Sequence, residues 1–134
     1  IQKQEKRRLH QIISQEGIEG FTLIENRVNA SIETEETVIA TGGSVVYGKE
    51  AMEHLSNIGT VVYLKVPFKT LEKRLADIKG RGVVLKEGQD LLGLFEERTP
   101  LYEKYADIMI DEDDLTVEQT VDKLIENLQF INKA

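Results

Sequence analysis

The sequence has 134 residues, of which 40% are hydrophobic and 31% are charged, and its formal net charge is −7 at pH 7. This length suits one domain with a buried core. The acidic balance argues against nucleic acid or an anionic membrane as a partner, because phosphate contacts need clustered Lys and Arg. The chain has no cysteine, which excludes disulfides and thiolate metal sites, and no apolar run of transmembrane length. We therefore expect a cytoplasmic protein.

Hydrophobic spacing predicts helices that alternate with short strands. A first helix covers residues 1–15 and is stopped by Gly17, and a second begins near Glu19. The other predicted elements are a strand at 37–41, a helix at 48–58, a strand at 60–66, a helix at 67–77, a polar connection at 79–89, a helix at 90–104, a strand at 106–110 and a helix at 116–130.

The last predicted helix has a clear start and a clear apolar side. Thr116 and Gln119 have the spacing of a capping box at its first turn. Its inner face is predicted to consist of Val117, Val121, Leu124, Ile125 and Leu128.

Strands that alternate with helices predict parallel βαβ units, and hence an α/β fold built as a three-layer α/β/α sandwich. No repeat or linker divides the chain, so we interpret it as a single domain over residues 1–134. Three strands make a small sheet, and two helices precede the first strand. We therefore expect that a part of the fold belongs upstream of Ile1.

Residues 43–49 nearly match the phosphate-binding loop G-x-x-x-x-G-K-[ST], but Glu50 occupies the position of the hydroxyl residue. A carboxylate there would repel phosphates, and two β-branched residues in the middle are poorly suited to the turns of a phosphate cradle. We interpret the match as accidental. The pair Gly42-Gly43 still follows a predicted strand, where it serves either a ligand or a plain turn.

Four longer stretches carry a resemblance to a known family. They are VIATGGS at 38–44, VVYLKVPFKTLEKRL at 61–75, RGVVL at 81–85 and ERTPLYEKYADIMID at 97–111. Their order and spacing resemble the shikimate kinase family over essentially the whole chain, and RTPLYEKYAD at 98–107 is the most specific piece.

This resemblance implies a P-loop NTPase-like fold with a five-stranded parallel sheet. It also implies transfer of the γ-phosphoryl group of ATP, with Mg²⁺, to the 3-hydroxyl of shikimate in aromatic amino-acid biosynthesis. In the family the phosphate loop lies upstream of the position that Ile1 matches. We therefore expect a chain truncated at its N-terminus, with no metal ligand of its own, that is active only when the phosphate-loop segment is present.

The resemblance also implies roles for individual residues on the substrate side. Arg98 matches the arginine that grips the substrate carboxylate, a task that suits a planar guanidinium. The alternative for Arg98 is an ion pair within its helix, to Asp90 or Glu103. Gly42 and Gly43 match the backbone platform on which the substrate lies, and Ser44 replaces a third glycine, where a positive φ would be costly.

On the nucleotide side, Arg81 matches the lid arginine that closes over the γ-phosphate, although its surroundings differ from the family motif R-P-L-L. Arg74 matches the residue that stacks on adenine. The alternatives are a solvated loop arginine for Arg81 and an exposed helix residue for Arg74. The corresponding segments are substrate-binding helices at 1–35, a core at 36–78, a lid at 79–89 and a C-terminal core at 90–134.

One departure from the family leaves the substrate open. The motif F-R-x-x-E appears as FTLIE at 21–25, so Thr22 replaces a second carboxylate anchor. Loss of one charged hydrogen bond weakens binding by about 1.5–3 kcal/mol. Besides a shikimate kinase, we therefore keep a monomeric kinase for another hydroxy acid, and an inactive ligand-binding or regulatory relative. A generic interaction module explains the ordered arginines and glycines least well.

Overall fold

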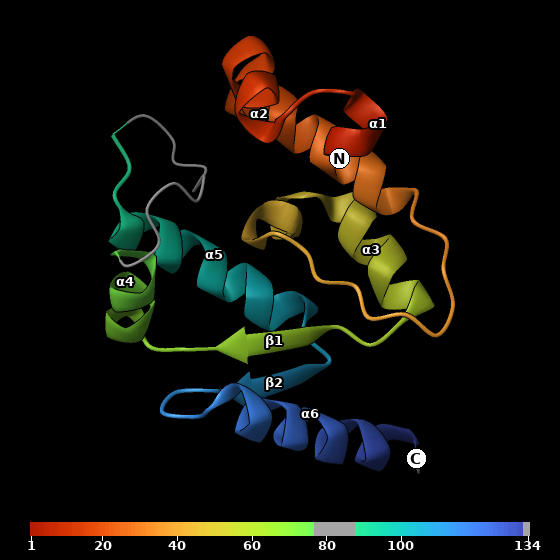
Figure 1. Ribbon diagram of the computed structural model, residues 1–134, viewed down its shortest axis with the longest axis vertical. Coiled ribbons are helices and arrows are strands. Elements are labelled where there is room, and N and C mark those ends of the chain that lie inside the picture. The colour runs from red at the N-terminus through yellow and green to blue at the C-terminus, as the bar shows by residue number, and fades with distance from the viewer. Residues whose placement is uncertain (77–87, 133–134) are drawn as a thin grey trace.

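The computed structural model describes residues 1–76 and 88–132, and Figure 1 shows the order of their helices and strands. The elements are α1 (Gln2–Glu5), α2 (Leu9–Ala30), the 3-10 helix η1 (Gly43–Tyr47), α3 (Lys49–Ile58), β1 (Val62–Lys65), α4 (Phe68–Ala76), α5 (Leu91–Tyr105), β2 (Ile108–Asp111) and α6 (Val117–Asn132). The helices predicted at 48–58, 67–77, 90–104 and 116–130 are confirmed as α3, α4, α5 and α6. Residues 79–87 of the predicted lid, which include Arg81, lie outside the described residues.

Strands β1 and β2 pair in parallel, with Val62 opposite Ile108. A parallel pair needs a crossover connection, and α4 and α5 belong to the segment that joins the two strands. The strands lie between α5 and α6 in Figure 1, and Tyr63 of β1 stacks on Tyr102 of α5 with 5.1 Å between ring centroids. The predicted α/β class with a parallel sheet is confirmed.

The strand predicted at 37–41 is wrong for the described structure. Val38 is 94% exposed, and the Thr37 hydroxyl donates to the carbonyl of Glu35 at 2.7 Å, next to Glu36 with a φ of 47°. A strand buried on both faces needs neighbouring strands, and among the described residues β1 and β2 pair only with each other. The apolar run therefore remains a loop segment without a partner strand in the described part of the chain.

The N-terminal helices follow the prediction in one respect and depart from it in another. Gly17 interrupts α2 with φ 72° and ψ 178°, as its predicted role as a helix stop requires. The helix predicted over 1–15, however, is also broken at Lys6, which has a φ of 54°. Arg8 is extended there and its N–H donates to the Gln11 side chain at 2.8 Å, so a new helix begins at Leu9.

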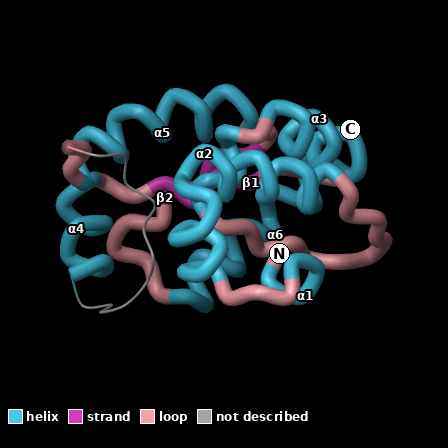
Figure 2. The backbone as a smooth tube through the Cα atoms, turned by 90° about the horizontal axis from the view of Figure 1, so that it is seen from above, coloured by secondary structure: helices cyan, strands magenta, loops and turns pink. Residues whose placement is uncertain are grey.

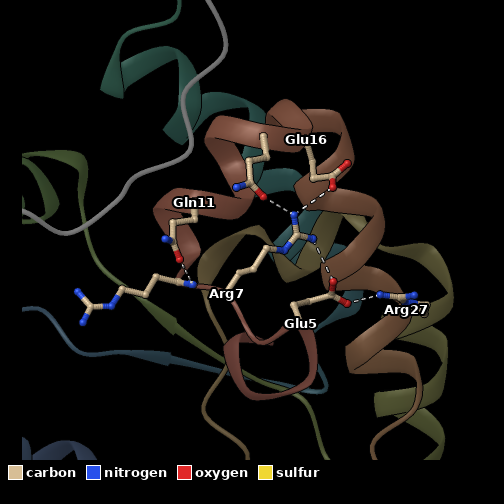
Figure 3. Close-up of polar contacts among 7 residues, drawn as sticks. Glu5, Arg7, Gln11, Glu16 and Arg27 are labelled. Atoms are coloured by element: carbon tan, nitrogen blue, oxygen red, sulfur yellow. Dashed lines mark hydrogen bonds and ion pairs between the residues drawn. The ribbon is translucent and has the colours of Figure 1, made fainter.

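Ion pairs fasten α1 to α2 beside this break (Figure 3). The guanidinium of Arg7 donates to the side chains of Glu5, Gln15 and Glu16. Glu5 also pairs with Arg27, which lies in the half of α2 beyond the Gly17 kink. Spacing alone does not reveal these pairs, because they form only once the chain has turned at Lys6.

The buried core lies where η1 and α3 meet α2 and α5. Its central members are Val45, Val46, Ala51, Met52 and Leu55. Partly buried side chains pack around them, and these are Ala30, Val61, Leu101, Tyr102 and Tyr105. The core therefore supports the glycine-containing segment that precedes α3.

Helix α6 begins as predicted but does not bury the predicted face. The Gln119 N–H donates to the Thr116 hydroxyl, and the Thr116 N–H donates to the Gln119 side chain, which is the expected capping box. Of the predicted inner face, Leu124 and Leu128 are half-buried, whereas Val117 (80% exposed), Val121 and Ile125 are exposed. The helix contacts the described chain mainly through β2, which is too narrow to cover the whole stripe. Within residues 1–76 and 88–132, no helix has the length and apolarity needed to cross a membrane.

Candidate functional site

The glycine pair leads into η1, which faces a buried carboxylate on α2. Gly42 is extended, with φ −75° and ψ 158°, and Ser44 is buried in the first turn of η1. The Ser44 hydroxyl donates to Glu25 Oε2 at 2.9 Å. Ser44 is not among the residues with positive φ, so the backbone cost expected for a serine in place of glycine does not arise.

Glu25 is the charged residue at the centre of this region. Only 4% of it is exposed, and its Oε1 atom is buried without a hydrogen-bond partner in the described structure. Burial raises the pKa of Glu25, and the hydrogen bond from Ser44 and the positive charge of Arg98 offset this only in part. Glu25 and Gly42 also line a cavity of about 510 Å³ between α1, α2 and residues 39–42.

Gly43 allows two side chains of α5 to approach the backbone closely. The Tyr102 hydroxyl donates to the carbonyl oxygen of Gly43 at 2.8 Å. A Cβ atom added to Gly43 would lie 2.8 Å from the Tyr102 hydroxyl oxygen and 3.0 Å from Arg98 Nη1. Only glycine leaves this space, so the structure brings Arg98 and the glycine pair together.

Arg98 is also in contact with Tyr47, at the end of η1. Its Nε–H group faces the Tyr47 hydroxyl at 3.4 Å, and its guanidinium carbon lies 5.4 Å from the centre of the Tyr47 ring. The alternative ion-pair partners expected for Arg98 make other contacts. Asp90 accepts a hydrogen bond from the Gly93 N–H, and Glu103 pairs with Lys65. The described contacts of Arg98 therefore join α5 to η1.

The near match to a phosphate loop does not form a cradle. The N–H groups of Val45 and Gly48 donate to carbonyl groups of the same segment, as they must in a 3-10 helix. The start of α3 is occupied by Asn26 of α2, which accepts from the Ala51 N–H at 2.9 Å and donates to Glu50 at 2.9 Å. These N–H groups are therefore not available to a phosphate group.

The residues predicted for the nucleotide side lie apart from this group. Arg74 pairs with Glu112, which follows β2, and the nearby Thr70 hydroxyl donates to Asp113 at 2.7 Å. Helix α4, which carries Arg74, is on the opposite side of the molecule from α3 in both views (Figures 1 and 2). Arg81 lies outside the described residues, so its place relative to the site is not described.

Three site residues were not singled out by the sequence. Tyr47 contacts Arg98, and the Tyr102 hydroxyl donates to the Gly43 carbonyl. Glu97 accepts a hydrogen bond from Tyr47 at 2.7 Å. Tyr102 and Glu97 stand inside the motif ERTPLYEKYADIMID, so that motif was the available signal. Tyr47 carried no such signal, because it lies in the false phosphate loop.

Thr22, the departure from the family motif, lies one turn before Glu25 on α2. Its hydroxyl donates to the carbonyl of Ile18 at 2.9 Å, within the same helix. The hydrogen-bonding capacity of this side chain is thus used locally, and Thr22 supplies no positive charge beside Glu25.

The family model for shikimate kinase matches residues 1–129. The chain belongs to the shikimate kinase family. Membership makes it a phosphotransferase that acts on an alcohol group, which is the expected enzyme class.

Individual relatives agree with this assignment. The chain is 38% identical over 119 residues to a shikimate kinase of Pseudoalteromonas translucida and 36% identical over 121 residues to one of Shewanella sp. strain ANA-3. Both matches cover 86% of this chain and 69% of the relative.

Solved structures of the family show the same fold. The shikimate kinase from Acinetobacter baumannii in complex with shikimate has a TM-score of 0.79 and 28% identity, over 98% of this chain and 75% of that one. The shikimate kinase from Bacteroides thetaiotaomicron has a TM-score of 0.76 and 23% identity, over 99% and 79% of the two chains. At that identity the second likeness concerns the fold alone.

Proposed function

We propose that this chain acts as a shikimate kinase, which transfers the γ-phosphoryl group of ATP to the 3-hydroxyl of shikimate. The observation that carries the proposal is the approach of the Arg98 guanidinium to the Gly43 backbone, next to buried Glu25, in a chain of this family. Shikimate offers a carboxylate and several hydroxyl groups. A guanidinium suits the carboxylate, and bare backbone with a carboxylate acceptor suits the hydroxyl groups.

The proposed roles divide the acid from its hydroxyl groups. Arg98 binds the carboxylate through paired N–H groups, and Gly42-Gly43 lets the ring lie directly on the main chain. Ser44 and Glu25 hold the segment that carries this platform against α2, through their 2.9 Å hydrogen bond. Because phosphoryl transfer depends mainly on positioning and charge stabilisation, these residues act by holding the acceptor hydroxyl in place.

The ATP side of the proposal rests on fewer described residues. We assign Arg74 to adenine and Arg81 to a lid over the γ-phosphate by their match to the family. Mg²⁺ would neutralise phosphate charge during transfer. Among the described residues, however, no group of three or more His, Asp or Glu side chains fits a metal ion, so we assign no step to Mg²⁺ here. The proposed enzyme works as a monomer in the cytoplasm, where ATP is available.

A second candidate is a kinase for another small hydroxy acid. It is favoured by Thr22, which stands where the family motif has a second arginine beside Arg98. The Thr22 hydroxyl donates within α2. A substrate with a more weakly held carboxylate, or with additional hydroxyl groups facing Glu25, would suit this arrangement.

The first test is binding of shikimate to the chain, measured by isothermal titration calorimetry, together with ADP release from Mg-ATP measured with the phosphate-loop segment present. Arg98→Ala should weaken binding about 10- to 100-fold, the worth of one charged hydrogen-bonding group. Arg98→Lys should recover little, because an ammonium group cannot make the paired contact. The control is Arg27→Ala, which removes an exposed guanidinium that pairs with Glu5.

The outcomes separate the candidates. Tight binding that survives Arg98→Ala would contradict the proposed role of Arg98. Failure of shikimate to bind, with Arg98-dependent binding of a related acid such as quinate, would favour the second candidate.

A further inference from the structure

Tyr47 contacts Arg98 in two ways at once. Its hydroxyl oxygen faces Nε at 3.4 Å, and its ring lies under the guanidinium, with 5.4 Å from the guanidinium carbon to the ring centre. The second arrangement is a cation–π contact, which orients the plane of the guanidinium as well as attracting its charge. Arg98 Nη1 meanwhile lies against Gly43, at the other end of η1. The guanidinium is therefore set against both ends of one short helix.

The orientation of the Tyr47 hydroxyl is itself fixed by its neighbours. The hydroxyl donates its only proton to Glu97 Oε1 at 2.7 Å, and the other carboxylate oxygen of Glu97 accepts from Gln89 at 2.8 Å. Because that proton is committed to Glu97, the oxygen presents its lone pairs to the N–H group of Arg98. A chain of polar contacts thus runs from Gln89 through Glu97 and Tyr47 to Arg98.

We infer that Tyr47 is a positioning residue for Arg98, and that it holds the guanidinium in the orientation that binds the substrate carboxylate. The inference rests on the proposed function for its consequence, but not for its geometry. Tyr47 contacts the face of the guanidinium and Nε of Arg98, so it has no need of the two terminal nitrogens that make an end-on pair with a carboxylate. It can therefore orient the group in the free and in the bound protein alike.

The ionisation of Tyr47 agrees with this role. Burial raises its pKa, the hydrogen bond with Arg98 lowers it, and the hydrogen bond to Glu97 raises it again. The net effect is a pKa above the ordinary value for tyrosine, so the phenol keeps the proton that it donates to Glu97 at neutral pH.

The test compares Tyr47→Phe, which keeps the ring and removes the hydroxyl, with Tyr47→Leu, which removes both contacts. The first readout needs no ligand: it is the Nε–Hε signal of Arg98 in ¹⁵N NMR spectra, assigned by its loss in Arg98→Lys. Tyr47→Phe should speed exchange of this proton with water, and Tyr47→Leu should also shift the signal, because the ring no longer lies beside it. The matched control is Tyr105→Phe, which removes a tyrosine hydroxyl from α5 at the edge of the core.

The second readout is shikimate affinity. Tyr47→Phe should raise the dissociation constant about 3- to 10-fold and Tyr47→Leu by more, with melting temperature close to that of the wild type. In assays of turnover with the phosphate-loop segment present, the KM for shikimate should rise while the KM for ATP stays constant, which a general loss of structure would not produce.

An Arg98 signal that is the same in the wild type and both Tyr47 variants would overturn the inference, whether or not shikimate binds. An equal change in Tyr105→Phe would overturn it too. If the wild type fails to bind shikimate while Tyr47→Phe still alters the Arg98 signal, the proposed function is contradicted and the positioning of Arg98 by Tyr47 is supported.

Discussion

Side chains are more deeply buried at the end of the molecule around η1 than at the end around the two strands. Around η1, the helices α2, α3 and α5 enclose a core, and Met52 of α3 is only 3% exposed. Around the two strands, Met109 of β2 is 57% exposed and α6 leaves much of its apolar face open. The candidate site belongs to the first end. Its side chains are held by packed neighbours, and Tyr102 also stacks on Tyr63 of β1.

Polar contacts follow the same division. At the site, Ser44 and Glu25 are both buried, and their hydrogen bond is shielded from water. At the sheet, Lys65 and Glu103 lie 3.9 Å apart with about half of each side chain exposed. Pairs of the second kind contribute little to stability, whereas a buried hydrogen bond that is broken leaves a costly unpaired group. Substitutions at the site end should therefore have the larger effects.

The chain has two methionines, one in each of these two regions of the molecule. They allow the most direct test of the difference in burial. Met52→Ala should lower the free energy of unfolding by about 2–5 kcal/mol, because it leaves a cavity in a packed core. Met109→Ala should change it by only about 0.5 kcal/mol, because water already reaches that side chain. Urea unfolding followed by circular dichroism measures both. Equal effects would mean that the two ends are equally buried in solution.

The next effect concerns binding rather than stability. Gly43→Ala places a methyl group against Tyr102 and Arg98, and should weaken shikimate binding about tenfold or more, the worth of a charged hydrogen bond. The cost to unfolding should be smaller than that of Met52→Ala, because the atoms nearest to the new methyl group belong to side chains and not to the backbone. Calorimetry and thermal melts measure the two quantities. Gly59→Ala is the control, because its backbone is extended and its new Cβ has only the Leu55 carbonyl nearby, at 3.9 Å.

The kink in α2 should have a smaller effect on stability than the loss of the buried Met52 side chain. Gly17→Ala forces a side chain into a backbone region that is essentially restricted to glycine, and should cost about 1–3 kcal/mol. No atom lies within 4 Å of the added Cβ, so the cost arises from the backbone and not from a clash. Thermal unfolding measures it. A gain in stability would show that residue 17 joins a straight helix in solution without loss elsewhere.

The smallest expected effect is a change in pH dependence. Because burial raises the pKa of Glu25, the folded state holds its proton more tightly than the unfolded state, where the pKa is near 4.5. This contribution to stability is largest at low pH and is lost as pH rises from 4.5 through the raised pKa. Glu25→Gln should remove that part of the decline and be more stable than the wild type at pH 7. Melts across pH 4–8 test this, and the surface variant Glu53→Gln should follow the wild type.

Much of the fold could be predicted, because local signals suffice for helices. The spacing of apolar residues located α3 to α6, and Gly17 and the Thr116–Gln119 pair marked ends that the structure confirms. The strand at 37–41 could not be judged in this way. An apolar run has the same composition whether or not a neighbouring strand pairs with it, and pairing is a property of distant residues.

The candidate site shows the same limit. Arg98 and the glycine pair stood in motifs, and the structure places them side by side. Tyr47 is 51 positions from Arg98 in the sequence, and its contact with Arg98 exists only because η1 packs against α5. Likewise, nothing near Lys6 announced the turn that breaks the first helix, because Arg7 stabilises it through side chains eight and nine positions ahead.

Asn26 has a consequence for how the protein opens and refolds. Its side chain caps the start of α3 from α2, and Gly48 leaves it room, since a Cβ there would lie 2.4 Å from Asn26 Oδ1. The two helices cannot separate without exposing the Ala51 N–H at the start of α3. In hydrogen exchange, the first amides of α3 should therefore become accessible together with the middle of α2, so that the two helices behave as one cooperative unit.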